Sequence, residues 1–206
     1  GDRHPSTLTT IGNLGMLLKA KGDLAAAEPL YREALEVQLE TLGSRHPSTL
    51  TFINNLSMLL EAKGDLAGAE PLCRKALEGC RETLGSRHPD TITSINNLGM
   101  LLKAKGDLAA AETLQREALE GLRETLGDRH PSTINSIYGL SQLLQDKGDL
   151  AAAEPLLREV LEGLRELAGS QHPSTLAIMN KLDMLLQVKG DVAAAEINWP
   201  LACHIS

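Results

Sequence analysis

Aromatic side chains are nearly absent from this chain, which has one Phe, two Tyr and one Trp in 206 residues. Its core must therefore be built from Leu, Ala, Ile and Met, and most of these are good helix formers. We expect an all-helical protein without strands.

The sequence also lacks an excess of positive charge and any long apolar run. Its 20 Lys and Arg residues face 27 Asp and Glu residues, so the formal net charge is −7. Nucleic acids and anionic membranes attract clustered Lys and Arg, and no such cluster occurs. No stretch of 18 or more apolar residues and no signal peptide is present. We expect a soluble, cytoplasmic protein that binds neither nucleic acid nor membrane.

Cysteine is scarce, with Cys73, Cys80 and Cys203. Seven residues on one helix place Cys73 and Cys80 about 10 Å apart. This exceeds the roughly 7 Å that a disulfide can span. We expect reduced, structural thiols in a reducing compartment, with a reactive or metal-binding thiol as the alternative.

What the chain does contain is a repeat. The stretch RHPSTL at residues 45–50 has close copies at 3–8, 87–92, 129–134 and 171–176, always 42 residues apart. Residues 44–85 and 86–127 agree at 32 of 42 positions without a gap. A fixed interval indicates a structural unit. We therefore treat residues 1–206 as a single array of five repeats, at about 1–43, 44–85, 86–127, 128–169 and a divergent 170–206.

Each repeat is predicted to form two helices. In repeat two, an apolar stripe with spacings of three and four lies at Leu50, Ile53, Leu56 and Leu60. Such a stripe is typical of an amphipathic helix, here called helix A. Gly64 suits the end of this helix and Asp65 suits the N-cap of the next one, helix B, which ends at Gly85.

The recurring His-Pro dipeptide is interpreted as a marker of helix starts. Proline is favoured in the first helical turn, so helix A should begin near Pro5, Pro47, Pro89, Pro131 and Pro173. Ser48 or Asp90, just after the proline, can serve the open N-terminus. Imidazoles in stacked repeats should lie roughly 10 Å or more apart, too far to share a metal ion. We expect no metal and no other cofactor.

Catalysis is not expected either. Each repeated histidine lies in a loop beside proline, and the glutamates lie on the charged outer stripe of helix B. No nucleophile, base and orienting group can be assembled from these spacings. We predict no catalytic residues, and we predict that the protein is not an enzyme.

The first repeat fits the tetratricopeptide pattern at Ile11, Leu14, Gly15, Leu18, Ala27 and Tyr31. The 42-residue period, with its NNL, AEPLY and HP elements, resembles the longer variety found in kinesin light chains and nephrocystin-like proteins. The resemblance implies a right-handed superhelical solenoid of about five helix-turn-helix repeats. It also implies that helix A lines the concave side and helix B covers the outside.

This resemblance implies a protein–protein interaction scaffold that binds an extended peptide in the concave groove. Asn offers a donor and an acceptor on a short stem, and Met offers a deformable apolar surface. The candidate residues are Asn13, Asn54, Asn55, Met58, Asn96, Asn97, Met100, Lys103, Asn135, Tyr138, Asn180 and Lys181. An alternative for Asn54 and Asn96 is that they only tie neighbouring helices together.

The expected partner is a protein or peptide. Lys19, Lys103 and Lys181 outnumber Glu61 and Asp146 on the expected groove face, which favours an acidic or C-terminal carboxylate ligand. Two other functions stay open. The array could be a structural element that stacks end to end with copies of itself through Trp199 and the terminal helices, or a regulatory sensor arm of a larger signalling protein.

Overall fold

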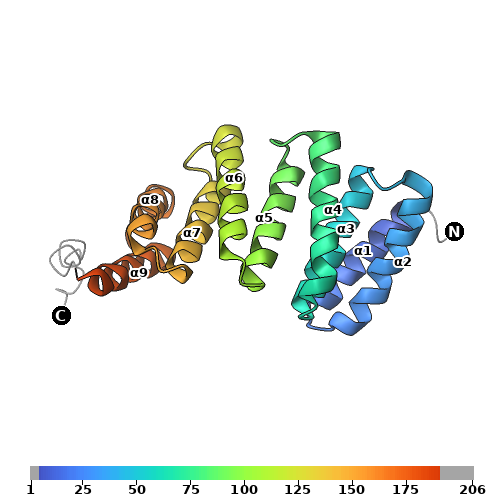
Figure 1. Cartoon of the computed structure of the whole chain (residues 1–206), viewed down its shortest axis with the longest axis horizontal. Coiled ribbons are helices and arrows are strands. Elements are labelled where there is room, and N and C mark those ends of the chain that lie inside the picture. Colours follow the sequence, from blue (N-terminus) through green and yellow to red (C-terminus); the bar gives the residue numbers. More distant parts are fainter. Residues whose placement is uncertain (1–4, 191–206) are drawn as a thin grey trace. The chain divides into compact units, whose positions relative to one another are not determined.

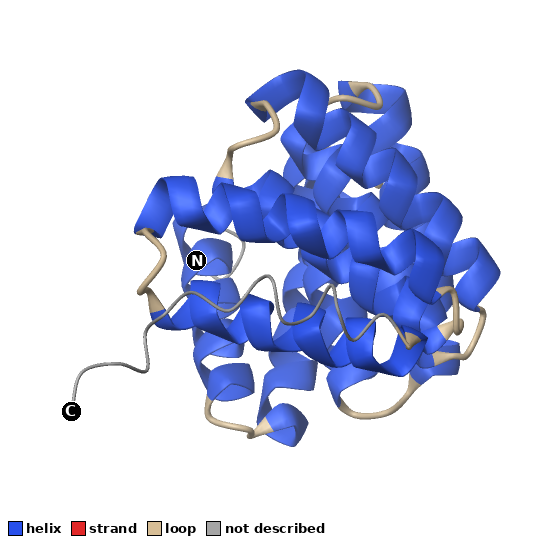
Figure 2. Cartoon of the chain, turned by 90° about the vertical axis from the view of Figure 1, so that its left-hand side faces the viewer, coloured by secondary structure: helices blue, strands red, loops and turns tan. Residues whose placement is uncertain are grey.

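The computed structural model describes residues 5–190, which contain helices and no strand (Figures 1 and 2). The helices are α1 (Pro5–Ala20), α2 (Leu24–Leu42), α3 (Pro47–Ala62), α4 (Leu66–Leu84), α5 (Pro89–Ala104), α6 (Leu108–Leu126), α7 (Pro131–Asp146), α8 (Leu150–Ala168) and α9 (Pro173–Lys189). The all-helical prediction is confirmed, and every helix A begins at the proline that the sequence predicts.

The turn between the two helices of a repeat follows from its Lys-Gly-Asp sequence. Gly64 has a φ of 83°, and the next amide, that of Asp65, donates to the carbonyl of Leu60 at 2.9 Å. This closes the end of α3. The Asp65 carboxylate then accepts the N–H of Gly68 at 2.9 Å, so the same short turn caps the start of α4.

The repeated histidines have a role that the sequence analysis did not assign to them. His46 is the N-cap of α3, and its Nδ1 accepts the backbone N–H of Ser48 at 3.2 Å. His88, His130 and His172 make the same contact with the residue two positions further on. The imidazole therefore caps the open N-terminus of helix A, and in α5 the acidic Asp90 also lies in the first turn, as predicted.

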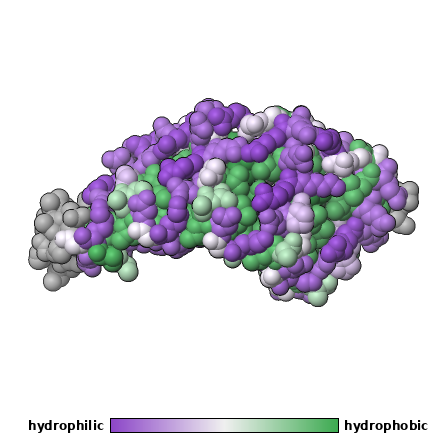
Figure 3. Space-filling view, viewed as in Figure 1, coloured by the Kyte–Doolittle hydropathy of each residue, from purple (hydrophilic) through white to green (hydrophobic). Residues whose placement is uncertain are grey.

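The chain divides into two compact units, Gly1–Leu114 and Gln115–Ser206, with the boundary inside α6. In the first unit, each helix from α1 to α5 packs against the next, and α3 also contacts α5. In the second unit, α7 packs on α8 and α8 on α9. On the face shown in Figure 3, polar residues cover much of the helices and apolar residues lie between them.

The predicted apolar stripe of repeat two is buried, with Leu50 and Ile53 each 1% exposed. A glycine lets α4 approach this stripe closely. A Cβ atom at Gly79 would lie only 2.4 Å from the Cδ2 atom of Leu50, and Gly163 has the same relation to Ile134 at 2.5 Å. Repeat one has Val37 at this position, so its two helices cannot approach in the same way.

Ion pairs link helix B of one repeat to the end of helix A in the next repeat. Glu28 of α2 pairs with Arg32 one turn further on, and also with Lys63 at the end of α3. The same inter-repeat contact joins Glu70 to Lys105 and Glu154 to Lys189. Hydrogen bonds from these cations hold the pKa of each of the three glutamates below its usual range.

Candidate functional site

A small hollow lies between α3 and α5 of the first unit, with a volume of about 100 Å³. Four of the predicted groove residues line it: Asn54, Asn55, Met58 and Asn97. We call it the amide hollow. These four side chains lie together because stacking of the repeats places equivalent positions of successive helix A segments side by side on one surface.

Asn54 is tied to the neighbouring helix and is nearly buried, at 8% exposed. Its Nδ2 donates to Ser94 Oγ of α5 at 2.7 Å, as the helix-tying alternative requires. Its Oδ1, however, accepts no hydrogen bond from the described residues. Only half of this amide is therefore used by the fold.

Asn97 presents the complementary group to the same hollow. It is 6% exposed, and its Nδ2 finds no acceptor within the described part of the chain. Asn54, with one unused acceptor, and Asn97, with one unused donor, thus both line the amide hollow, and the two unused atoms are themselves buried. Unmade hydrogen bonds of buried groups are costly and rare in folded proteins.

The remaining candidates of the first unit lie nearer the surface. Asn13 is exposed, and Met100 is 46% exposed. Asn55, Met58, Asn96 and Lys103 are half-buried. These residues leave polar and flexible apolar groups accessible beside the amide hollow.

In the second unit, the candidates group around Tyr138 of α7. The ammonium of Lys181 on α9 lies 5.2 Å from the centre of the Tyr138 ring, and the Tyr138 hydroxyl accepts a hydrogen bond from Gln142 at 3.0 Å. Asn135 and Asn180 are exposed. The second unit therefore presents an aromatic and cationic surface where the first presents amides.

The predicted charge balance is altered by local pairing. Burial raises the pKa of the Glu61 carboxyl, and the positive charge of Lys19 opposes this rise. Lys19 and Glu61 thus offset each other on the first unit's helix A face. The exposed cation Lys181, which lies over Tyr138, belongs to the second unit.

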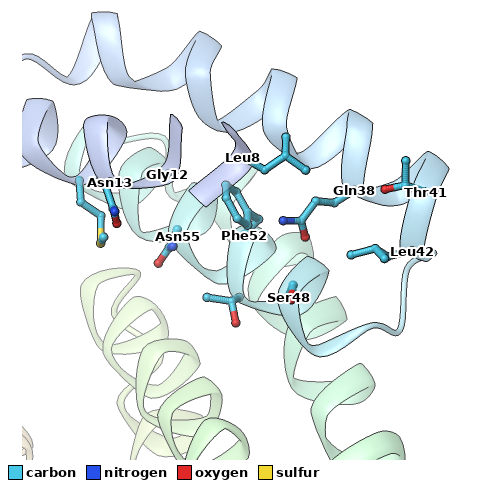
Figure 4. Close-up of a pocket in the computed structure, with 11 residues that line it drawn as sticks. Leu8, Gly12, Asn13, Gln38, Thr41, Leu42, Ser48, Phe52 and Asn55 are labelled. Carbon is cyan, nitrogen blue, oxygen red and sulfur yellow. The ribbon is translucent and has the colours of Figure 1, made fainter. Parts of the chain in front are cut away.

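A larger hollow, of about 380 Å³, lies among α1, α2 and α3 (Figure 4). We call it the N-terminal hollow. Its apolar wall consists of Leu8, Met16, Leu42 and Phe52, and Gln38 lies beside them. Two of the predicted groove residues, Asn13 and Asn55, also line it, but the sequence did not indicate a separate hollow. Three of the positions at which repeat one differs from repeat two lie in or near it: Val37 for Gly79, Gln38 for Cys80 and Gly12 for Asn54.

Within residues 5–190, no group of three or more His, Cys, Asp or Glu side chains is placed to hold a metal ion. The thiols Cys73 and Cys80 are free and buried, and burial raises the pKa of both. No helix in this part of the chain combines the length and apolar character that crossing a membrane requires. Trp199, proposed for self-association, lies outside the described residues.

The antiparallel helix pairs, their 42-residue period and their stacking define an all-α repeat solenoid. A family model for the tetratricopeptide repeat matches residues 6–70, 48–124 and 96–166. These matches span more than half of the chain. The chain belongs to the tetratricopeptide repeat family.

Several solved structures are similar. A putative kinesin light chain of Podosopora anserina, described as having nearly identical TPR-like repeats, is 28% identical with a TM-score of 0.84 and covers 95% of this chain and 92% of that chain. BtubC (BKLC) of P. vanneervenii is 24% identical with a TM-score of 0.82, covering 94% and 77%. The predicted kinesin light chain type of repeat is confirmed. No curated protein matches the sequence.

Proposed function

We propose that the chain is a protein-interaction scaffold whose helix A face binds an extended segment of a partner. Tetratricopeptide repeats generally serve as interaction scaffolds and use the concave surface that stacked repeats create. The observation that carries the proposal is the amide hollow, which Asn54 and Asn97 both line and where each has one amide atom without a partner among the described residues.

An extended peptide fits these two groups. Each non-proline peptide unit carries one N–H donor and one carbonyl acceptor. A bound segment could donate to Asn54 and accept from Asn97 without requiring a particular side chain. Each hydrogen bond formed removes a desolvation penalty of about 1–3 kcal/mol that the free protein carries.

Residues beside the hollow would contact the side chains of the partner. Met58 and Met100 offer flexible apolar surface, which adapts to different shapes. We expect acidic segments to bind better than basic ones, as predicted from the lysines. The preference should be modest because Glu61 lies close to Lys19. A binding function without catalysis, in the reducing cytoplasm, is consistent with the free buried thiols.

The proposal is tested with peptides selected from a random display library on the wild-type chain. Affinities of the selected peptides are then measured for Asn97→Leu and for the outer-face variant Arg32→Ala, whose parent side chain is 57% exposed. Asn97→Leu should weaken binding at least tenfold, whereas Arg32→Ala should leave it unchanged. Equal affinities for Asn97→Leu and wild type would refute peptide binding at the amide hollow.

A second candidate is end-to-end association through α1. Leu14 and Leu17 are 45% and 52% exposed, whereas the equivalent Leu56 and Leu59 of repeat two are 2% and 0% exposed. Exposed apolar surface of this kind favours a protein contact. Sedimentation over a concentration series should show association that Leu17→Lys abolishes. A chain that stays monomeric at hundreds of micromolar would exclude this role.

A further inference from the structure

The N-terminal hollow lies at positions equivalent to those of the amide hollow, one repeat earlier, and it is the larger of the two. Val37 occupies the position at which Gly79 and Gly163 admit the facing Leu50 and Ile134. A side chain at this position leaves less room for α1 and α2 to approach each other than a glycine does. The hollow of about 380 Å³ is lined by residues of these two helices and of α3.

The C-terminal end of α2 is also built differently. The Gly43 N–H bonds the carbonyl of Gln38, five residues back, whereas the equivalent Gly85 bonds Arg81, four residues back. In repeat three the Thr91 hydroxyl donates to the carbonyl of Gly85 at 2.7 Å. Its counterpart Thr49 has no such partner among the described residues. The departure is thus confined to the end of α2 that borders the hollow.

A buried amide borders this space. Gln38 is 4% exposed, and its Oε1 receives no hydrogen bond from any residue in the described range. Figure 4 shows the Gln38 side chain reaching from α2 toward the ring of Phe52. The hollow thus has an unsatisfied amide beside its apolar wall, and the uncharged polar side chains of Asn13, Thr41, Ser48, Thr51 and Asn55 complete the lining.

Every residue that lines the N-terminal hollow is uncharged, although the chain as a whole is rich in charge. A charged ligand would lose its hydration there and gain no counter-charge. The volume of about 380 Å³ lies within the usual range of small-molecule pockets, about 300–1,000 Å³. The lining therefore favours a ligand that is neutral, largely apolar and able to donate one hydrogen bond.

We propose that the N-terminal hollow binds a small neutral molecule that has an apolar body and a single O–H or N–H donor. The body packs on Phe52 and Leu8, and the donor bonds Gln38 Oε1. A side chain of a bound protein could carry the same chemistry, but the volume of about 380 Å³ is that of a small-molecule pocket, and on this ground we assign the site to a free ligand. This proposal does not depend on a segment binding at the amide hollow.

The test uses p-cresol and 4-methylanisole, two neutral ring compounds of similar shape, of which only p-cresol has an O–H donor. Each is titrated into the isotope-labelled full chain and followed by NMR. Saturable shifts should appear at Leu8, Gln38 and Phe52, and 4-methylanisole should bind roughly threefold to tenfold more weakly. Equal binding of the two probes to wild type, or no saturable shift at these residues, would overturn the proposal.

Two variants sharpen the test. Gln38→Met keeps the volume but removes the acceptor, so it should abolish the difference between the probes. The matched control is Gln115→Met, which alters another buried glutamine whose Oε1 has no partner in the described range but which does not line this hollow. It should leave both affinities unchanged. Binding of the cresol ring only when it is carried by a peptide would contradict the assignment to a free ligand.

Discussion

Two contacts between successive helix A segments use equivalent positions in opposite ways. Between α3 and α5, Asn54 donates to Ser94 at 2.7 Å. Between α1 and α3, the same two positions hold Gly12 and Phe52, and a Cβ atom on Gly12 would lie 2.9 Å from the ring. The α3–α5 contact is thus a hydrogen bond, and the α1–α3 contact is the packing of an aromatic ring against a glycine.

These two kinds of contact occur between helices of the same length, but the hollows beside them differ in size and in lining. The polar contact borders a hollow of about 100 Å³ with two unused amide groups, and the aromatic contact borders one of about 380 Å³ without charge. In a repeat protein with constant helices, pairs of positions 40 residues apart therefore decide what each part of the surface can bind.

The largest effect should come from exchanging one contact for the other. Phe52→Ser removes a ring that is 8% exposed and packs edge-on against Tyr31, so it should lower the free energy of unfolding by about 3 kcal/mol. Gly12→Asn alone should cost about 1–3 kcal/mol because its Cβ meets the ring. Urea denaturation measures both.

The double variant Gly12→Asn with Phe52→Ser recreates the polar pair of the next contact. We expect its loss to be smaller than the sum of the single losses by about 1 kcal/mol or more. Strictly additive losses would show that the two positions do not act as a pair.

The two asparagines of the amide hollow should differ in their effect on stability. Asn54→Ala removes the bond to Ser94 and leaves a buried hydroxyl with fewer partners, which should cost about 1 kcal/mol. Asn97→Leu removes a donor that is already unused and should be close to neutral. Thermal unfolding compares the two variants. A larger loss of stability for Asn97→Leu than for Asn54→Ala would show that Asn97, not Asn54, stabilises the fold.

The histidine caps should contribute a similar amount. His46→Ala removes the acceptor for the Ser48 N–H and should cost about 1 kcal/mol, while His46→Asn supplies another good N-cap and should restore most of it. Chemical denaturation of both variants at neutral pH provides the measurement. Equal losses for Ala and Asn would mean that proline alone sets the helix start.

The smallest effect is expected at the inter-repeat ion pairs. Because Lys105 and Arg74 lower the pKa of Glu70 in the folded state, the stabilisation is complete above about pH 4.3 and is lost as the pH falls through the folded-state value. Solvent screens the pair, so Glu70→Gln should cost on the order of 0.5 kcal/mol at pH 7. The cost should vanish in acid.

Glu61→Gln is the matched control for the acid experiment. Burial raises the pKa of Glu61, so its charged form opposes folding and acidification relieves that cost. The difference in free energy of unfolding between wild type and Glu61→Gln should therefore change with pH in the direction opposite to that expected for Glu70→Gln. The same trend for both variants would contradict the assignment of the two shifts.

Period and helical propensity were enough to predict the fold, because each repeat restates the same local signals. The starts at Pro47 and Pro89 and the Gly64–Asp65 turn depend only on neighbours in sequence. The capping role of His46 was missed because imidazole is not among the usual N-cap side chains. Its regular position beside proline was the available signal.

The candidate site was less predictable because it depends on contacts between repeats. Spacing placed Asn54 and Asn97 on one face, but it could not show which amide atoms the fold already uses. The N-terminal hollow brings together Gln38 of α2 and Phe52 of α3, which are far apart in sequence. Comparing equivalent positions of the repeats marks these departures, but only packing shows that they meet.

Binding of an extended segment at the amide hollow can be followed through the side-chain amide NMR signals of its asparagines. A peptide selected on the wild type is titrated into the labelled chain while the Asn54 and Asn97 side-chain NH₂ resonances are followed. We expect large, saturable shifts at Asn97 and smaller ones at Asn54, whose NH₂ already bonds Ser94. Saturation of the peptide without any shift at Asn97 would contradict it.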